Sequence, residues 1–521
     1  MTGVELGLAI VATVDICLKH GRTLVHMCAA FKNAETAIAH RILRVKQSWT
    51  RASYHLDFLR RVAHILPPEY QQLQNQTLEV LLEKLKITIT MLESMVKGES
   101  STPMHDQTQQ TFRVRRGKYA RSEERLNKAI DDLETWQGIF DPSWYLIIKA
   151  AIPQVDEELA RYAGGPAQKA ISTTHSLKHA LSSGSQNPTP IWLPEDGLVD
   201  TTLIDIPFSP ARVAQRPNSS RELILESISV PRNVNIAVLT KDIREFARKL
   251  SHADPVTFGL LNCKGVTKHF EQPAQHPSAF TFVFRMPDGY SKPTSLRKLL
   301  IERNSDHSLS DRFTIACQLA KSVGYIHTFG FVHKNVRPDN ILMLKPREGS
   351  MEHAYLVGFE QVRTAEGTTS RIGDTAWERN LYRHPRRQGG TPEEDYVMQH
   401  DIYSLGVCLL ELGIWRSFVD YEPGELGPQT PRPSLALELS SESVGFDKSF
   451  LVKDHLQSLA RRALPRCMGT KYANIVETCL TCLDPDNTDF GDEREFQDSD
   501  GILVGVRYIE KILMQLNTIS V

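Results

Sequence analysis

Apolar residues recur at helical spacing from the start of the chain. Val4, Leu8 and Val11 follow one another at intervals of four and three, and Leu6, Ile10 and Val14 form a second such set. Two interleaved sets place apolar side chains around almost the whole circumference of a helix. We therefore expect this helix either at the centre of a bundle or in a membrane. The residues that a bilayer would receive are Val4, Leu8, Ile10, Val11 and Val14.

Further helical patterns follow at 31–66, at 73–96 and in a last pair beginning near 126. Pro67 and Pro68 end the first of these, because proline cannot continue a helix. Residues 1–165 show no strand-like alternation, which predicts an all-α N-terminal helical bundle of about five helices. A basic stretch within it is either a solvated helix start or a contact for an anionic membrane: Arg113, Arg115, Arg116, Lys118 and Arg121.

The pattern changes twice along the rest of the chain. Residues 166–220 are rich in Gly, Ser, Pro and Asn and are interpreted as a linker with a short helix near 176–181. From 221 on, strand patterns precede helical ones, which favours an α+β two-lobed domain. Its small lobe is expected at about 221–288 and its large lobe at about 289–521. The expected elements are strands at 222–230, 279–286, 341–344 and 354–359 and a helix at 241–250.

Composition narrows the function classes. The 521 residues are 41% hydrophobic and 24% charged, with a formal net charge of −1. A near-neutral chain is not built to coat nucleic acid, so no nucleic-acid partner is expected. No signal peptide and no membrane-spanning apolar run is seen, which predicts a cytoplasmic protein. Cys479 and Cys482 form a C-x-x-C without a second pair, so no metal site is expected.

Three segments carry candidate chemistry. Residues 331–342 contain His333, Pro338 and Asn340 in the register of H-R-D-L-x-x-x-N, and thus resemble the catalytic loop of a protein kinase. Residues 355–360 stand where the kinase D-F-G motif belongs. Asp401 opens an apolar helical run that resembles the kinase helix bracing the catalytic loop. The resemblance implies mainly structural roles for His333, Phe359 and Asp401.

The same alignment indicates degraded chemistry. The catalytic Asp is replaced by Asn335, whose amide cannot accept a hydroxyl proton, and the metal-binding Asp by Gly358. Glu360 is displaced by one position and is a poor substitute. Asn340 remains as a weak metal ligand, and Arg337 replaces a loop lysine and could still meet a phosphate.

The small lobe lacks further parts of a nucleotide site. No G-x-G-x-x-G-x-V loop precedes its strands, and the strand at 223–228 has no lysine. Lys241 opens the following helix instead of lying in a strand, and Glu245 then has no strand lysine to pair with. We therefore expect no cofactor, with neither ATP nor magnesium bound.

The N-terminal region carries a second resemblance. Residues 6–10 and 15–21, with the tryptophan-rich stretch 132–146, resemble the HeLo domain of fungal heterokaryon-incompatibility prion proteins. The combined layout is similar to that of the mixed-lineage kinase-like pseudokinases. The resemblance implies a helical executioner of programmed cell death, restrained by a regulatory domain. It also implies an upstream receptor or adaptor, self-association through the bundle and recruitment to an anionic plasma membrane.

Three functions stay open at this point. The first is a catalytically inactive kinase-like protein controlling a membrane-active or self-associating bundle. The second is an active or residually active protein kinase, against which Asn335 and Gly358 argue. The third is an interaction scaffold without membrane activity.

Overall fold

The computed structural model divides the chain into two compact units, 1–175 and 176–519, and each is treated by itself. The described residues are 3–29, 36–98, 112–114, 153–162, 190–198, 200–217, 221–230, 235–271, 276–302, 307–347, 352–359, 363–364, 374–422, 430–490 and 502–519.

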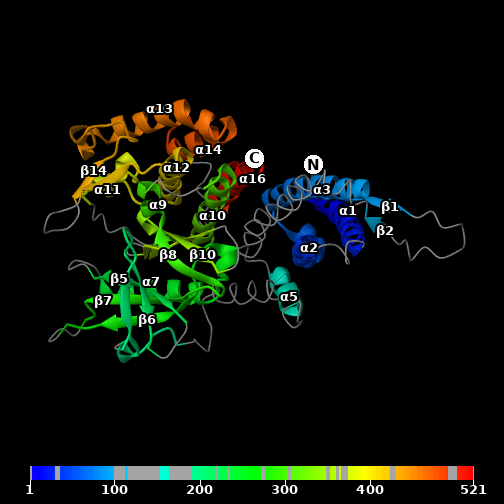
Figure 1. Cartoon of the computed structure of the whole chain (residues 1–521), viewed down its shortest axis with the longest axis horizontal. Helices are drawn as coiled ribbons and strands as arrows, with labels where there is room; N and C mark the ends of the chain where they lie inside the picture. Colours follow the sequence, from blue (N-terminus) through cyan, green and yellow to red (C-terminus); the bar gives the residue numbers. More distant parts are fainter. Residues whose placement is uncertain are drawn as a thin grey trace, which may run out of the picture. The chain divides into compact units, whose positions relative to one another are not determined.

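The first unit is helical in its described part. The long helices α1 (Gly3–Ala29), α2 (Thr36–Val62) and α3 (Pro68–Met95) are followed by the shorter α5 (Pro153–Tyr162), as labelled in Figure 1. Pro68 opens α3, where a missing N–H costs no hydrogen bond. α1 packs against both α2 and α3. The last helix pair, expected to begin near residue 126, starts outside the described residues, so the five-helix bundle stays a prediction.

One expectation for this unit was wrong. Strands β1 (Val96–Gly98) and β2 (Phe112–Val114) form an antiparallel hairpin in a region where no strand was expected. Three residues per strand are too few to produce a recognisable alternation of apolar and polar positions.

Helix α1 buries one side. Ile10 and Val14 are fully buried, whereas Leu8 is 66% exposed and Val11 is half-buried. The side chain of Val4 lies outside the described residues. A Cβ on Gly21 would lie 1.7 Å from the Trp49 ring of α2, so only glycine permits this close packing of α1 on α2. Among the described residues no helix is both long and apolar enough to cross a bilayer.

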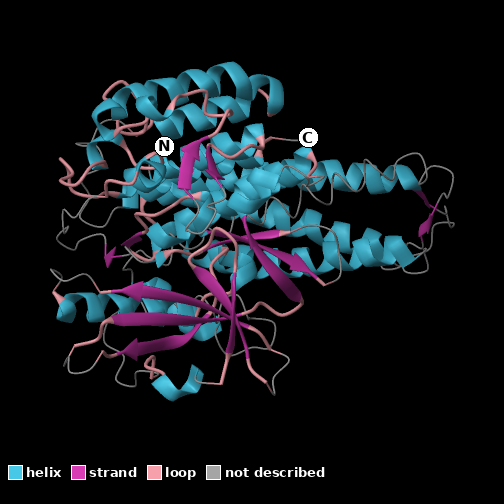
Figure 2. Cartoon of the chain, turned by 60° about the vertical axis from the view of Figure 1, so that its left-hand side comes forward, coloured by secondary structure: helices cyan, strands magenta, loops and turns pink. Residues whose placement is uncertain are grey.

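The second unit opens with a five-stranded antiparallel sheet in the order β3-β4-β5-β7-β6, seen in Figure 2 as a twisted fan of strands. Helix α7 (Ile236–Ser251) packs against β6, and Asn235 caps its first turn. The strands are β3 (Thr202–Asp205), β4 (Ala211–Gln215), β5 (Leu223–Ser229), β6 (Cys263–His269) and β7 (Ala279–Arg285).

The position of β3 and β4 corrects the expected boundaries. Both strands fall within 166–220, which was interpreted as a linker, so the sheet begins some twenty residues before the small lobe's expected start at 221. β3 is an edge strand, and all four of its residues are exposed. An exposed edge strand has no apolar face and therefore leaves no alternating pattern to detect. The helix expected near 176–181 lies outside the described residues.

The rest of this unit is mainly helical. The buried helix α12 (Met398–Ile414) contacts α10, α13 and α14, and β8, β10 and β11 form a small sheet beside α10. Two further strand pairs are β9 (Phe331–Val332) with β12 (Arg363–Thr364) and β13 (Val419–Glu422) with β14 (Thr430–Pro433). The remaining elements are α8 (Pro255–Phe258), β8 (Tyr290–Ser295), α9 (Leu296–Glu302), α10 (Leu309–Thr328), β10 (Ile341–Pro346), β11 (His353–Leu356), α11 (Trp377–Asn380), α13 (Ser449–Cys467), α14 (Thr470–Leu480), α15 (Ile502–Tyr508) and α16 (Met514–Asn517).

Candidate functional site

Asp401, in the first turn of α12, organises the loop that follows β9. Its buried carboxylate accepts hydrogen bonds from the backbone N–H groups of His333 (2.7 Å) and Lys334 (2.8 Å). It also accepts from the Tyr396 hydroxyl (2.6 Å) and from His327 Nε2 (3.0 Å). Burial alone would raise its pKa, but the hydrogen bonds and charge of His327 hold the pKa at about 2. Asp401 thus stays ionised and fixes the loop, including Lys334 at the left-handed φ of 66°.

The His333 ring connects this loop to the segment after β11. Its Nε2 donates to the carbonyl of Val357 (3.0 Å), and its Nδ1 accepts from the N–H of Asn335 (3.2 Å). Both bonds require the neutral ring, and burial lowers the pKa of His333 to about 4. The neighbouring Phe359 ring packs against Phe246 of α7 with centroids 4.8 Å apart. His333 and Phe359 therefore tie the loop to the small-lobe helix.

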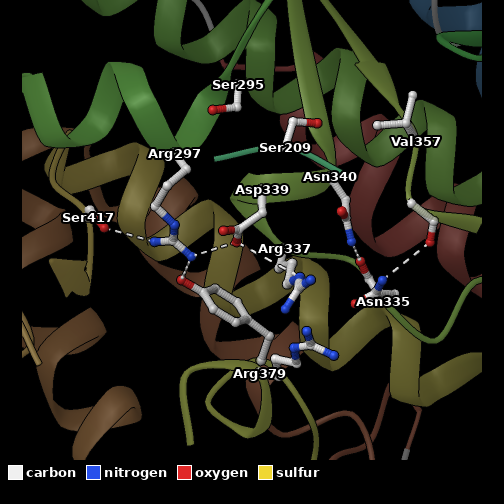
Figure 3. A network of polar contacts seen from close by, with 12 residues as sticks. Ser209, Ser295, Arg297, Asn335, Arg337, Asp339, Asn340, Val357, Arg379 and Ser417 are labelled. Atoms are coloured by element: carbon white, nitrogen blue, oxygen red, sulfur yellow. Dashed lines mark hydrogen bonds and ion pairs between the residues drawn. The ribbon is translucent and has the colours of Figure 1, made fainter. Parts of the chain in front are cut away.

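Asn335 and Asn340 connect the loop to the segment at Gly358. Asn335 Nδ2 donates to the Gly358 carbonyl (3.3 Å), and Asn340 Nδ2 donates to the Asn335 carbonyl (2.7 Å), as Figure 3 shows for the two amides. A Cβ on Gly358 would lie 2.2 Å from Asn340 Cγ, and Gly358 has a φ of 89°. The Asn340 amide thus occupies the volume into which a side chain at position 358 would extend.

Glu226 is the site residue that sequence reasoning missed. It lies in the middle of β5, is 1% exposed, and accepts hydrogen bonds from the N–H groups of Gly358 (3.0 Å) and Phe359. Protein kinases carry their phosphate-binding lysine on the third strand of the sheet, and β5 is the third strand here. An acidic residue therefore stands on that strand. The available signal was a single charge within the apolar run 223–228.

The ion pair of α7 is internal to the helix. Glu245 contacts Lys249 Nζ at 3.0 Å, so its partner is a lysine of the same helix and not of a strand. Lys249 also donates to the Phe329 carbonyl (2.8 Å). Lys241, offered as a substitute for a strand lysine, is exposed on the same helix.

Arg337 belongs to a second polar network, drawn in Figure 3. Its Nε lies 3.9 Å from Asp339, which accepts a hydrogen bond from the fully buried Arg297 (3.0 Å). Arg297 also donates to Glu411 (3.0 Å), to Ser417 (2.8 Å) and to the Tyr382 hydroxyl (2.7 Å). Burial favours a lower pKa for Arg297, but the charges of Asp339, Tyr382 and Glu411 outweigh burial and raise the pKa well above its ordinary value.

The remaining candidate residues offer little to a metal. Glu360 lies outside the described residues. Cys479 and Cys482 are buried, and burial raises both thiol pKa values. Within the described ranges no cluster of His, Cys, Asp or Glu has the geometry of a metal site. Asn340 Oδ1 is buried and accepts no hydrogen bond from the described residues, so it is an oxygen that a cation could still contact.

Comparison with known proteins agrees with this geometry. The family model described as protein tyrosine and serine/threonine kinase matches residues 284–416. A probable serine/threonine-protein kinase of Dictyostelium discoideum is 27% identical over 212 residues, which are 39% of this chain and 11% of that protein. CDPK-related kinase 7 of Arabidopsis thaliana is 26% identical over 193 residues, covering 34% of this chain and 31% of the relative. A protein kinase and PP2C-like domain-containing protein of Arabidopsis thaliana is 32% identical over 203 residues, covering 37% and 29%.

The chain thus spans less than a third of the length of these relatives. It contains a protein kinase domain with homologues at low identity.

The packing around Gly358 predicts a specific cost for any side chain there. Gly358→Ala forces the Asn340 amide to rotate and lose its bond to Asn335, and it also strains a left-handed φ. We expect a loss of about 2–4 kcal/mol in the free energy of unfolding. Chemical denaturation measures it. Gly469→Ala is the matched control, because Gly469 has a similar φ of 84° and no neighbour within 4 Å.

A double variant checks the assignment to Asn340. Asn340→Ala with Gly358→Ala should cost less than the sum of the two single substitutions, because the crowding is removed. Equal losses for Gly358→Ala and Gly469→Ala would contradict the proposed crowding.

The neutral His333 ring predicts acid sensitivity. Its folded pKa of about 4 lies below the ordinary 6.5, so the unfolded chain takes up a proton first as the pH falls. Stability is therefore fully present above about pH 6.5 and is lost down to pH 4, by about 3 kcal/mol for this group. Asp401, with a pKa of about 2, stays ionised throughout this window. His384, whose pKa burial lowers to about 3, acts in the same direction.

Melting temperatures between pH 7.5 and 4.5 measure this effect. His333→Gln keeps a donor but cannot titrate, so it should reduce the pH dependence, while His276→Gln, at an exposed position, should not. An unchanged pH profile for His333→Gln would refute the assignment.

Proposed function

We propose that the kinase-like unit is a catalytically inactive regulatory module that controls the helical N-terminal unit. In this proposal the N-terminal unit is a HeLo-like bundle that acts on a membrane or self-associates, in fungal incompatibility or another form of programmed cell death. The main observation in support of a loss of catalysis is that the Asn340 amide occupies the space beside Gly358. A metal-binding carboxylate at 358 would need that space.

Two further features support inactivity. Asn335 offers an amide where a kinase needs a general base. Glu226 places a buried carboxylate against the backbone of Gly358 and Phe359, on the strand where a kinase presents a lysine to the phosphates. In a medium of low dielectric constant, a carboxylate repels a nucleotide triphosphate strongly. The proposal therefore includes no bound ATP and no bound magnesium.

A residually active kinase is the alternative that one observation favours. The matched relatives are named as kinases, and Asn340 Oδ1 has no hydrogen-bond donor among the described residues. An interaction scaffold without membrane activity is the second alternative.

The exposed face of α1 supports a membrane role. Leu8 and Ile16 lie eight residues apart on this face and are 66% and 44% exposed. Since no described helix can span a bilayer, the proposed contact is interfacial, with α1 lying along the membrane surface. The proposal places the protein in the cytoplasm, from which an upstream receptor or adaptor recruits it to the plasma membrane.

Nucleotide binding tests the first part of the proposal. Mg-ATP should not raise the melting temperature, because a ligand stabilises only in proportion to its affinity for the folded state. Magnesium sulfate alone is the control. A shift that reports an affinity tighter than about 100 μM would falsify the proposal and favour the kinase alternative. Asn335→Asp should not produce phosphate transfer from labelled ATP, since Glu226 and Asn340 remain in place.

Liposome binding tests the second part. Ile16→Glu in the full chain should reduce binding to, and dye release from, vesicles containing anionic lipid, because it puts a charge on the α1 face. Ile87→Glu on α3 is the matched control, since Ile87 is also 44% exposed. Both variants should keep wild-type helicity. Equal dye release from Ile16→Glu and wild type, or none from wild type, would favour the scaffold alternative.

A further inference from the structure

Three arginine side chains converge beside the loop that carries Asn335. Arg337 comes from this loop, Arg379 from α11, and Arg383 from the turn that follows α11. The Nη1 atoms of Arg379 and Arg383 lie 3.3 and 3.6 Å from the same oxygen of Asp374. Figure 3 shows the guanidinium ends of Arg337 and Arg379 turned toward the same region. We call these three residues the arginine cluster.

Among the described residues, the arginines of the cluster share their carboxylate partners. Asp374 is shared by two of the arginines, and the carboxylate beside Arg337 is Asp339, which already accepts from Arg297. The ion pairs in this described part of the chain join four guanidinium groups to three carboxylates: Arg297, Arg337, Arg379 and Arg383 to Asp339, Asp374 and Glu411.

One nitrogen of the cluster makes no hydrogen bond within the described residues, although it lies 3.9 Å from Asp339. This nitrogen is the Nε of Arg337, and it is buried. Burial lowers the pKa of Arg383, and the charges of Arg337 and Arg379 lower it further against the opposing effect of Asp374. The arginines are therefore close enough to repel one another, and an added anion would relieve that repulsion.

The three side chains differ in exposure. The side chains of Arg337 and Arg383 are 12% and 10% exposed, whereas that of Arg379 is 42% exposed. Guanidinium groups donate paired hydrogen bonds that match phosphate oxygens. A phosphate that contacts the exposed Arg379 would also reach Arg337 and Arg383, whose nearly buried side chains are held in place.

We propose that the arginine cluster binds the phosphate of a phosphorylated serine or threonine side chain on a partner protein. Arg337 of the cluster lies on the loop where a kinase positions the hydroxyl of its protein substrate, which favours a peptide-borne phosphate. On the nucleotide side, Glu226 repels phosphate. The inference rests on the proposed regulatory function and names its partner class: a module that recognises a phosphorylated protein in place of producing one.

Binding to phosphopeptides tests the proposal on the full chain. The probes are a degenerate fluorescent peptide mixture with one fixed phosphoserine or phosphothreonine, and the same mixture unphosphorylated. Fluorescence anisotropy should show at least about tenfold tighter binding of the phosphorylated mixture. Arg379→Ala should weaken binding of the phosphorylated mixture by about tenfold. Arg379→Lys should weaken it less, because lysine keeps the charge but cannot donate the paired hydrogen bonds of a guanidinium group.

Arg379 is the residue to change, because its exposure makes unfolding an improbable cause of lost binding. The control is Arg461→Ala on α13, an arginine that is also exposed and paired with a carboxylate, Glu477; this variant should leave binding unchanged. Equal affinity for both mixtures, or full affinity in Arg379→Ala, overturns the proposal. So does binding that is confined to inorganic phosphate or to vesicles with phosphoinositide headgroups. Mg-ATP binding and phosphate transfer, measured on the same samples, report on the proposed function independently of this result.

Discussion

The buried carboxylate of Asp401 is the constraint on which the site depends. An ionised group at this depth is tolerated only when donors replace the water it has lost. Here two backbone N–H groups, a tyrosine hydroxyl and a histidine ring supply them. Because both N–H groups belong to consecutive residues, the carboxylate fixes the backbone at His333 and Lys334. The positions of Asn335, Arg337 and Asn340 follow from that fixed start.

A second buried charge, that of Arg297, also holds the loop in place. Arg297 connects α9 to the loop through Asp339 and to α12 through Glu411. Removing one partner from such a buried network typically costs about 3–5 kcal/mol, since the others are left uncompensated. Both networks hold the backbone of the loop that carries Asn335 in place.

The sequence predicted the elements whose pattern lies within one short stretch of the chain. The strands β5, β7 and β10 and the helix α7 are marked by runs of apolar residues, and the loop is marked by the spacing of His333, Pro338 and Asn340. The strand β3 was missed because its four residues are exposed and show no apolar face. The buried strand β4 was missed because it lies within a stretch rich in Gly, Ser, Pro and Asn, which was interpreted as a linker. The role of Glu226 was missed for another reason. It contacts Gly358 across 132 positions of the chain, and no spacing rule reaches that far. The arginine cluster likewise exists only once the turn after α11 folds back to the loop.

The residues that differ from the kinase pattern in this site change its charge in different ways. Asn335 and Gly358 only remove negative charge, which weakens a metal site without excluding phosphate. In the proposed function, Glu226 places a carboxylate on the side where a kinase binds its nucleotide, and the arginine cluster places positive charge on the side of the protein substrate. Loss of catalysis alone requires only that carboxylates be removed. It does not account for added charges of opposite sign on the two sides of Asn335. The polarity disfavours a nucleotide triphosphate and favours a phosphorylated side chain, so the charges support a binding role better than a residual transfer activity.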